Sequence, residues 1–252
     1  MIRVLKDYNP PPMELKILYE DERLLALSKP SGLLSVPGIG ADRADCLAKR
    51  IAEKYPEALV IHRLDMDTSG VFLMARDKKA QGNIGKQFEQ RRVSKTYIAD
   101  IWGVPEESSG LIDLPLRCDW ENRPLHMVCH EHGKPAQTKW ELLEVRTLAS
   151  LREAQRRSNP EPQTGLPRRA DGPPRNDDEM KIARLKLEPI TGRTHQLRVH
   201  LKAIGFPIVG DAFYAPDDAY EASTRMHLHA HTLTFHHPDT GHKMTITDEV
   251  GF

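Results

Sequence analysis

Short apolar runs and alternating segments along this chain predict β-strands. Residues 17–30 predict two short strands on either side of a polar turn. Residues 95–103 place Tyr97 and Ile101 on one face and Trp102 on the other, which is the two-residue period of a strand. Further strands are expected at 71–75, 138–146, 181–189 and 226–237.

Three other segments have apolar residues at helical spacing after a capping residue. Asp77 is the expected cap of one helix, and Asp45 is the expected cap of another over residues 46–55. Thr194 is the expected cap of a third helix, which ends at Gly205 because glycine readily terminates a helix.

Residues 152–179 interrupt this pattern. Apolar periodicity is absent there after Ala154, and six basic side chains balance six acidic ones. The segment has too little apolar surface to offset the entropy lost on ordering it. We therefore predict a flexible insertion between two strands of one domain that spans residues 17–252, preceded by an N-terminal extension at 1–16.

The composition is that of a soluble globular protein with a sizeable core. The chain has 252 residues, of which 39% are hydrophobic and 29% charged, and no apolar run approaches the roughly 18–20 residues of a membrane helix. Cys46, Cys118 and Cys129 are odd in number and far apart, which favours a reducing compartment over a disulfide framework. No secretory signal opens the sequence. We expect a cytoplasmic, monomeric protein without a membrane partner.

Net charge is zero, with 36 basic and 36 acidic residues, so the whole-chain balance does not indicate a nucleic-acid partner. Residues 76–97 differ, because seven basic side chains stand there against two acidic ones. Such a run is most often a solvated helix face. The alternative is a surface that contacts phosphates beside a functional site.

The segment IHRLDMDTSG at 61–70 carries the strongest chemical signal. Asp65 follows an arginine and a leucine and precedes an apolar strand, so its carboxylate is poorly solvated and needs a cationic partner or a chemical task. The alternative is a turn aspartate that caps its own backbone. Asp67, in the turn itself, fits that alternative better than Asp65.

A cationic partner is available at 191–201, TGRTHQLRVHL. Arg193 and Arg198 lie near the start of the third predicted helix, where an arginine facing a buried carboxylate would keep it ionised and oriented. His195 and His200, five residues apart, do not share a helix face well and make a poor metal pair.

These motifs resemble the RluA family of pseudouridine synthases. The resemblance rests on HRLDxxTSG at 62–70, KxYxA at 95–99 and GRTHQLRVH at 192–200, in this order. The resemblance is closer to family members that modify both ribosomal and transfer RNA. It rests on the further segments YNPPP, SKPSGLLSVPG, CDWENRP, GKPAQT, KAIGFPIVGDAFY and LHA. The S4 RNA-binding domain of several relatives is not evident, and the insertion departs from the family pattern.

The resemblance implies an α+β fold, with a largely antiparallel mixed sheet, flanking helices and a central RNA-binding cleft. It also implies the reaction: the N1–C1′ bond of a uridine breaks, and the uracil rotates and rejoins through C5, which loses its proton. No metal, nucleotide or redox cofactor is needed. The implied substrates are a stem-loop of large-subunit (23S) ribosomal RNA and the anticodon stem-loop of tRNAs.

The resemblance also assigns residues. Asp65 takes the position of the catalytic aspartate, Arg198 that of its partner, and Tyr97 that of the residue that stacks on the target base and helps to remove the C5 proton. Arg63 matches the arginine that enters the space left by the flipped uridine. The full set of candidate substrate- or RNA-binding residues is His62, Arg63, Lys78, Lys79, Arg91, Arg92, Lys95, Arg193, His195 and Leu197.

Two rival hypotheses remain open at this stage. One is an RNA-binding protein of the same fold that has lost catalysis, against which the intact Asp65, Tyr97 and Arg198 argue. The other is a metal-dependent hydrolase, because His227, His229 and His231 alternate along one predicted strand and so share a face. No acidic ligand is obvious near them, so we do not expect a metal site.

Overall fold

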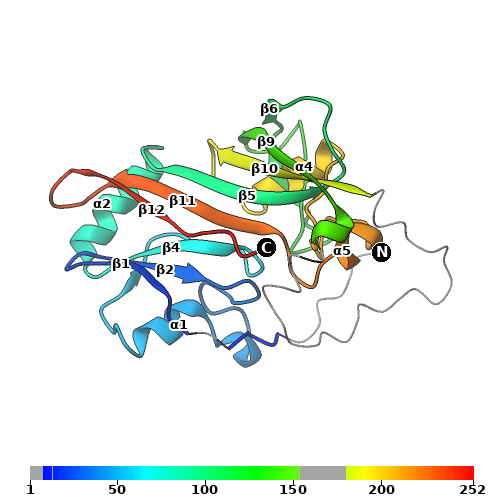
Figure 1. Cartoon of the computed structure of the whole chain (residues 1–252). Coiled ribbons are helices and arrows are strands. Elements are labelled where there is room, and N and C mark those ends of the chain that lie inside the picture. The colour runs from blue at the N-terminus through cyan, green and yellow to red at the C-terminus, as the bar shows by residue number, and fades with distance from the viewer. Residues whose placement is uncertain (1–7, 13, 152, 154–179) are drawn as a thin grey trace.

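The computed structural model describes residues 8–12, 14–151, 153 and 180–252. β-Strands are the main regular structure in these ranges, with short helices between them (Figure 1). The strands are β1 (Ile17–Glu20), β2 (Leu24–Lys29), β3 (Leu59–Val60), β4 (Ser69–Ala75), β5 (Ser94–Trp102), β6 (Ser109–Asp113), β7 (Leu116–Cys118), β8 (His126–Val128), β9 (Gln137–Thr147), β10 (Lys181–Pro189), β11 (Leu228–His236) and β12 (Lys243–Thr247). The helices are the 3₁₀ turn η1 (Ala41–Arg43), α1 (Leu47–Ala52), α2 (Lys78–Glu89), α4 (Gln196–Ala203) and α5 (Asp217–Glu221).

One ten-stranded sheet runs through the molecule in the order β1-β2-β4-β11-β5-β10-β9-β6, with β12 beside β11 and β3 beside β4. The β4–β11 pair is parallel, and the other pairs in this sheet are antiparallel. β7 and β8 form a separate two-stranded hairpin. The predicted α+β class with a largely antiparallel mixed sheet is therefore confirmed.

Gly70 makes the β4–β11 contact possible. Its φ is +109°, and a side chain there would place Cβ 2.3 Å from the carbonyl oxygen of Ala230 on β11. Only a residue without Cβ tolerates both the left-handed backbone and this approach. The contact joins the segment that carries Asp65 to the middle of the sheet.

Local hydrogen bonds determine where each helix begins. The first residues of α1 and α4 differ from the predicted ones. Asp77 caps α2 as expected, with Oδ1 accepting from the backbone N–H of Lys79 at 2.7 Å. The cap of α1 is Cys46 instead of Asp45, because the Asp45 carboxylate pairs with Arg50. The third helix, α4, starts at 196 and not directly after Thr194.

Apolar clusters cover both halves of the sheet. α1 packs on one face of β2 and β4, and α2 packs on the other face beside β12. α4 covers the half formed by β5, β10 and β9. In Figure 1, the last residues of the chain cross the sheet and end near its middle.

The predicted insertion lies almost wholly outside the described residues. The strands that flank it form a hairpin, since Thr147 of β9 pairs with Lys181 of β10 and the Leu148 N–H donates to the Met180 carbonyl at 2.9 Å. None of the helices in the described ranges is long and apolar enough to cross a membrane.

Candidate active site

The turn before β4 places Asp65 beside the strand that carries Tyr97. Gly70 of β4 pairs with Ala230 of β11, which pairs on its other side with Tyr97 of β5. The turn is closed by the Thr68 N–H, which donates to the Asp65 carbonyl at 3.1 Å. Three neighbouring strands thus bring together residues far apart in the sequence, as the motifs predicted.

Arg198, on α4, is the cation that faces Asp65. Its side chain is 2% exposed, and its Nη1 lies 3.4 Å from Oδ2 of Asp65. The Asp65 side chain is 27% exposed, so it is open to a substrate on one side and fixed on the other. Its Oδ1 has no hydrogen-bond partner within the ranges that the structure describes, which leaves that oxygen available.

The stronger partner of Arg198 is Asp211, which sequence reasoning missed. Nε and Nη2 of Arg198 donate to the two oxygens of Asp211 at 2.8 and 2.7 Å, and the Asp211 side chain is fully buried. Asp211 also accepts from the backbone N–H of Phe213 at 2.9 Å. This bidentate pair sets the guanidinium plane, and its remaining donor points at Asp65.

The two carboxylates raise the pKa of Arg198 above its usual value, against the effect of burial. The guanidinium is therefore a permanent positive charge between them. Its carbon lies 5.1 Å from the ring centroids of both Phe213 and Tyr214. These aromatic faces add cation–π contacts that hold it in place.

His195 is the second side chain, after Arg198, that lies beside Asp65. Its Nε2 lies 3.9 Å from Oδ2 of Asp65, and its Nδ1 shares a hydrogen bond of 2.7 Å with the Tyr214 hydroxyl. Burial lowers the pKa of His195 to about 4, so the ring is neutral at physiological pH. The residue has a left-handed backbone, φ +54°, at the start of α4, which turns the ring toward the site.

Tyr97 is half-buried on β5 and packs against the clusters of both halves of the sheet. Burial, and then the negative charge of Asp65, raise the pKa of Tyr97 above its usual value. The phenol therefore stays protonated. Its flat ring suits stacking on a base, whereas a protonated phenol is a poor proton acceptor.

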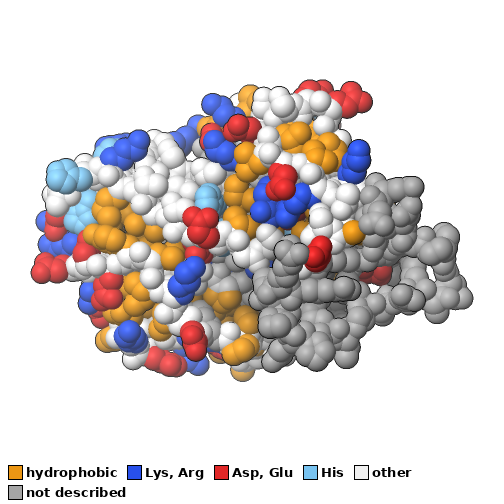
Figure 2. Space-filling view, in the orientation of Figure 1, with side chains coloured by type: hydrophobic (Ala, Val, Ile, Leu, Met, Phe, Trp, Pro, Cys, Tyr) orange, Lys and Arg blue, Asp and Glu red, His pale blue; other side chains and the backbone are white. Residues whose placement is uncertain are grey.

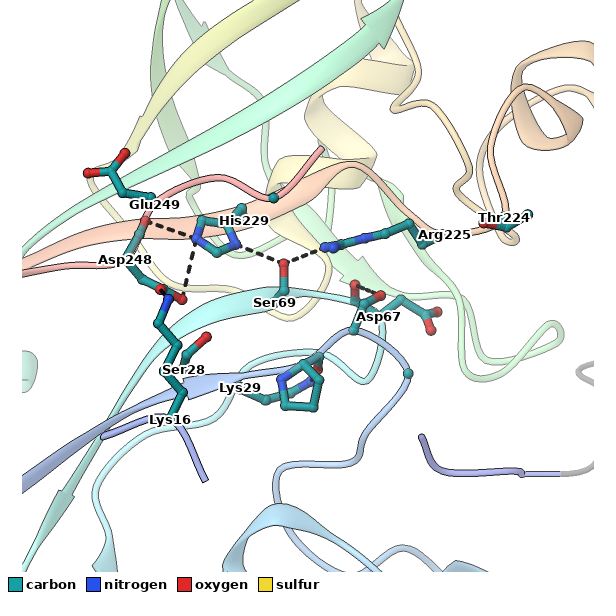
Figure 3. A pocket seen from close by; sticks show the side chains of 14 residues that line it. Lys16, Ser28, Lys29, Asp67, Ser69, Thr224, Arg225, His229, Asp248 and Glu249 are labelled. Atoms are coloured by element: carbon teal, nitrogen blue, oxygen red, sulfur yellow. Dashed lines mark hydrogen bonds and ion pairs between the residues drawn. The ribbon is translucent and has the colours of Figure 1, made fainter. Parts of the chain in front are cut away.

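The back of the turn that carries Asp65 is held by a chain of hydrogen bonds, drawn in Figure 3. Arg225 donates to the Ser69 hydroxyl at 2.5 Å, and that hydroxyl lies 2.8 Å from Nδ1 of His229. Nε2 of His229 lies 3.0 Å from the Asp248 carbonyl. A carbonyl only accepts, so Nε2 carries the proton and Ser69 donates to Nδ1.

An open pocket of about 520 Å³ is lined by these residues. It lies on the opposite face of the sheet from Tyr97, because His229 and Ala230 are consecutive on β11 and Ala230 pairs with Tyr97.

Lys29, at the end of β2, is a further residue that sequence reasoning missed. It is fully buried, and its Nζ donates to the carbonyls of Pro30 and Met66 at 2.8 Å each. Burial lowers the pKa of Lys29 to about 7, although Asp67 and Asp65 act in the other direction. By holding Met66, Lys29 fixes the backbone between those two aspartates. A lysine that directly follows an apolar strand was the available signal.

Comparison with known proteins agrees with this geometry. A family model described as RNA pseudouridylate synthase matches residues 23–203. This chain belongs to the RNA pseudouridylate synthase family. It is accordingly an isomerase of the pseudouridine synthase type.

Two relatives are named dual-specificity RNA pseudouridine synthase RluA. The protein of Escherichia coli (strain K12) is 43% identical over 249 residues, which cover 98% of this chain and 99% of the relative. That of Vibrio vulnificus (strain CMCP6) is 46% identical over 223 residues, 88% of this chain and 78% of the relative. The structure of human RNA pseudouridylate synthase domain containing 1 has a TM-score of 0.71 at 28% identity, covering 96% of this chain and 86% of its own.

Within this synthase, the predicted RNA-binding residues of the two motifs take different positions. Arg63 is exposed, as a residue that enters an RNA helix must be. Arg193 is exposed as well, and its Nε donates to the Pro135 carbonyl at 3.3 Å. Both lie within two residues of a side chain of the site, Asp65 or His195. They remain candidates for RNA contact.

His62 and Leu197 make packing contacts inside the protein. The His62 ring packs against Phe72 and Phe88, with centroids 5.0 and 5.2 Å away, and its Nε2 accepts from the Leu73 N–H. Leu197 is 6% exposed and packs in the core under α4. Both side chains therefore have packing contacts within the protein, and their contact with RNA stays a prediction.

The basic stretch at 76–97 is split by the fold. Lys78 and Lys79 are exposed at the start of α2, which follows the end of β4. Gly70 is near the other end of β4, so a rise of about 3.3 Å per residue places the two lysines about 20 Å from it. Arg91 and Arg92 are exposed after α2, and Lys95 lies 3.5 Å from the Thr191 carbonyl. Lys95 thus lies on the strand that carries Tyr97, whereas Lys78 and Lys79 lie beyond the far end of β4.

The three strand histidines of the synthase are engaged in hydrogen bonds within the protein, and His229 and His231 share one acceptor, the Asp248 carbonyl. His227 contacts the buried Asp100 carboxylate at 2.9 Å, His229 contacts Ser69, and His231 contacts the Asp248 carbonyl at 2.8 Å. No group of three metal-ligating side chains gathers in the described ranges. The hydrolase hypothesis therefore has no ligand set within these ranges.

Proposed function

We propose that this synthase converts specific uridines to pseudouridine in two kinds of RNA, a stem-loop of 23S ribosomal RNA and the anticodon stem-loop of tRNAs. The relatives named dual-specificity synthases, aligned over most of their length, support this range of substrates. The observation that carries the catalytic assignment is the Asp65 carboxylate, half-exposed and held at 3.4 Å by a buried arginine. We further propose a cytoplasmic monomer.

Asp65 is proposed as the essential carboxylate. The positive charge of Arg198 faces this carboxylate at 3.4 Å, and the bidentate Asp211 contact fixes the direction of that charge. An ionised carboxylate with one open oxygen either attacks the sugar at C1′ or removes the proton at C2′ as the glycosidic bond breaks. Both routes need the same placement of Asp65.

Tyr97 and Arg63 complete the site. The Tyr97 ring, protonated and half-buried, gives the detached uracil an apolar face to rest on while it rotates. Arg63, exposed on the turn, occupies the space that the flipped nucleotide leaves, where a planar guanidinium both stacks and donates hydrogen bonds. Unstacking costs a few kcal/mol, which these contacts offset.

The substitution Asp65→Asn tests the assignment because it keeps the shape and removes the charge. We expect release of tritium from RNA labelled at C5 of uridine to stop, while the Kd for an anticodon stem-loop stays within about tenfold, or roughly 1.4 kcal/mol. Asp42→Asn is the matched control, since the Asp42 side chain is 72% exposed in η1. Near-normal turnover by Asp65→Asn would refute the role of Asp65, and a wild type that binds without turnover would indicate a catalytically inactive RNA-binding protein.

A further inference from the structure

Trp120 is an exposed aromatic side chain with no role in the site described above. It is 64% exposed and lies in the loop between β7 and β8. The guanidinium carbon of Arg123 lies 4.0 Å from the centroid of its ring, so one face of the indole is covered by a cation. The other large exposed apolar side chains in the described ranges are aliphatic: Ile39, Leu111, Met127, Leu143, Val145 and Met180.

The loop that presents Trp120 is held by its own hydrogen bonds. The Asp119 N–H donates to the Leu125 carbonyl at 2.9 Å, and the Asn122 N–H donates to the Asp119 carbonyl at 3.2 Å. The Asn122 side chain donates to the Asp119 carboxylate at 3.0 Å. The loop that carries the indole is thus ordered before any partner arrives, which reduces the entropy lost on binding.

The same hairpin is attached to the wall of the catalytic site. The His126 N–H on β8 donates to the Tyr214 hydroxyl at 2.9 Å, and the His126 and His195 rings lie 5.3 Å apart. His195 is the residue 3.9 Å from Asp65. Trp120 is only six residues before His126, so the chain limits its Cα to about 20 Å from that of His126.

The charge of the hairpin region excludes a simple phosphate-binding surface. Residues 117–134 contain three basic and three acidic side chains. The region around Trp120 has no net charge, and the indole is a flat ring supported on one face by a guanidinium. Such a ring instead suits stacking on the π-face of a nucleobase. A target loop that gives up one uridine to the site has further unpaired bases beside it.

We propose that Trp120, supported by Arg123, stacks on an unpaired base of the substrate RNA next to the flipped uridine. This proposal rests on the proposed function, because the partner is the same RNA. Trp120 contacts no reacting atom and acts on affinity and register. Stacking on an aromatic ring contributes about tenfold or more in affinity per base.

The test compares Trp120→Ala and Trp120→Phe on an anticodon stem-loop RNA. Trp120→Ala should raise Kd and lower kcat/KM by about tenfold, with kcat at saturating RNA unchanged, and phenylalanine should restore most of the loss. The slope of log Kd against log salt should stay constant, because no phosphate contact is removed. RNA should also quench the fluorescence of the wild type more than that of Trp120→Phe, since Trp140 is buried and Trp102 is half-buried.

Two controls make the result specific. Leu143→Ala truncates another exposed apolar side chain, 49% exposed on β9, and should not change Kd. A fully paired RNA duplex of equal length should bind wild type and Trp120→Ala alike. Equal Kd values for the stem-loop, or an equal loss on the duplex, would overturn the stacking role while wild-type turnover still supports the proposed function. A wild type that neither binds nor modifies RNA would overturn both.

Discussion

At the scale of single residues, the buried guanidinium of Arg198 needs more hydrogen-bond acceptors than Asp65 supplies. A guanidinium has five N–H donors, and burying it against one half-exposed carboxylate leaves most of them unpaired. Asp211 meets that need with two hydrogen bonds. Asp211 follows a glycine in an irregular segment, where it looks like an ordinary turn residue, and only the fold shows that α4 brings Arg198 to it.

His62 has packing contacts that its motif position did not predict. The motif fixes its place three residues before Asp65, next to the exposed Arg63, and the fold packs its ring between two phenylalanines. Sequence periodicity cannot reveal this, because residues 61–65 belong to no regular element.

We predict that His62 contributes to loss of stability in acid. Burial lowers its pKa to about 4 from the 6.5 of an exposed histidine. Between those pH values the unfolded chain binds a proton that the folded protein does not, so the unfolding free energy falls as pH falls, by at most about 3 kcal/mol. In His62→Gln the unfolding free energy from urea titrations should depend less on pH from 6.5 to 4. The same change at His242, an exposed histidine before β12, is the control, and equal pH slopes in both variants would contradict the prediction.

At the scale of elements, periodicity predicted most strands to within two residues but not their neighbours. β4 and β11 are adjacent although more than 150 residues separate them, and no local pattern carries that information. Helix starts were less well predicted, because side chains compete for the same backbone groups. Gln196 accepts from the Thr191 hydroxyl and the Arg193 N–H, so the backbone before 196 stays non-helical.

The hairpin of β9 and β10 leads to a prediction about the insertion. Deleting residues 155–178 and joining the ends by a short glycine-containing turn should leave turnover on an anticodon stem-loop nearly unchanged. The strand ends already pair at Thr147 and Lys181, and a shorter loop costs slightly less closure entropy. Leu148 and Leu151, both buried, are retained. Turnover and Tm should match those of the full chain.

The competing view is that the insertion's arginines bind RNA phosphates. In that case the deletion variant would bind all RNAs more weakly, and its salt dependence would fall by about one unit of slope per lost contact. A deletion variant with the wild-type slope and lower Tm would instead show that the insertion supports the fold.

At the scale of the whole molecule, basic and acidic residues are equal in number. On the face in Figure 2, outside the grey atoms, Lys and Arg side chains alternate with Asp and Glu. This agrees with the zero net charge of the chain. RNA affinity must then depend on a few local cations near the site, together with contacts that carry no charge.

The split of the basic stretch gives a prediction that depends on RNA length. Lys78 and Lys79 stand about 20 Å from Gly70 along β4, so a minimal anticodon stem-loop centred on Asp65 should not need them. Replacing both lysines by glutamine should leave its Kd within about twofold and its salt slope unchanged. Arg193→Gln, beside the site, should lower that slope by about one.

If Lys78 and Lys79 bind RNA, their contribution to Kd should be measurable with a longer substrate. On full-length tRNA, the double glutamine variant should bind more weakly than the wild type and with a shallower salt slope, because a larger RNA extends past the end of β4 while a stem-loop does not. Lys79 lies 3.8 Å from Asp239, so its charge is already partly compensated and Lys78 should account for most of the change. Equal slopes on both RNAs would assign the two lysines to a solvated helix face. A loss already present on the stem-loop would mean that the RNA crosses the sheet along β4 toward α2, and that binding extends well beyond the residues around Asp65.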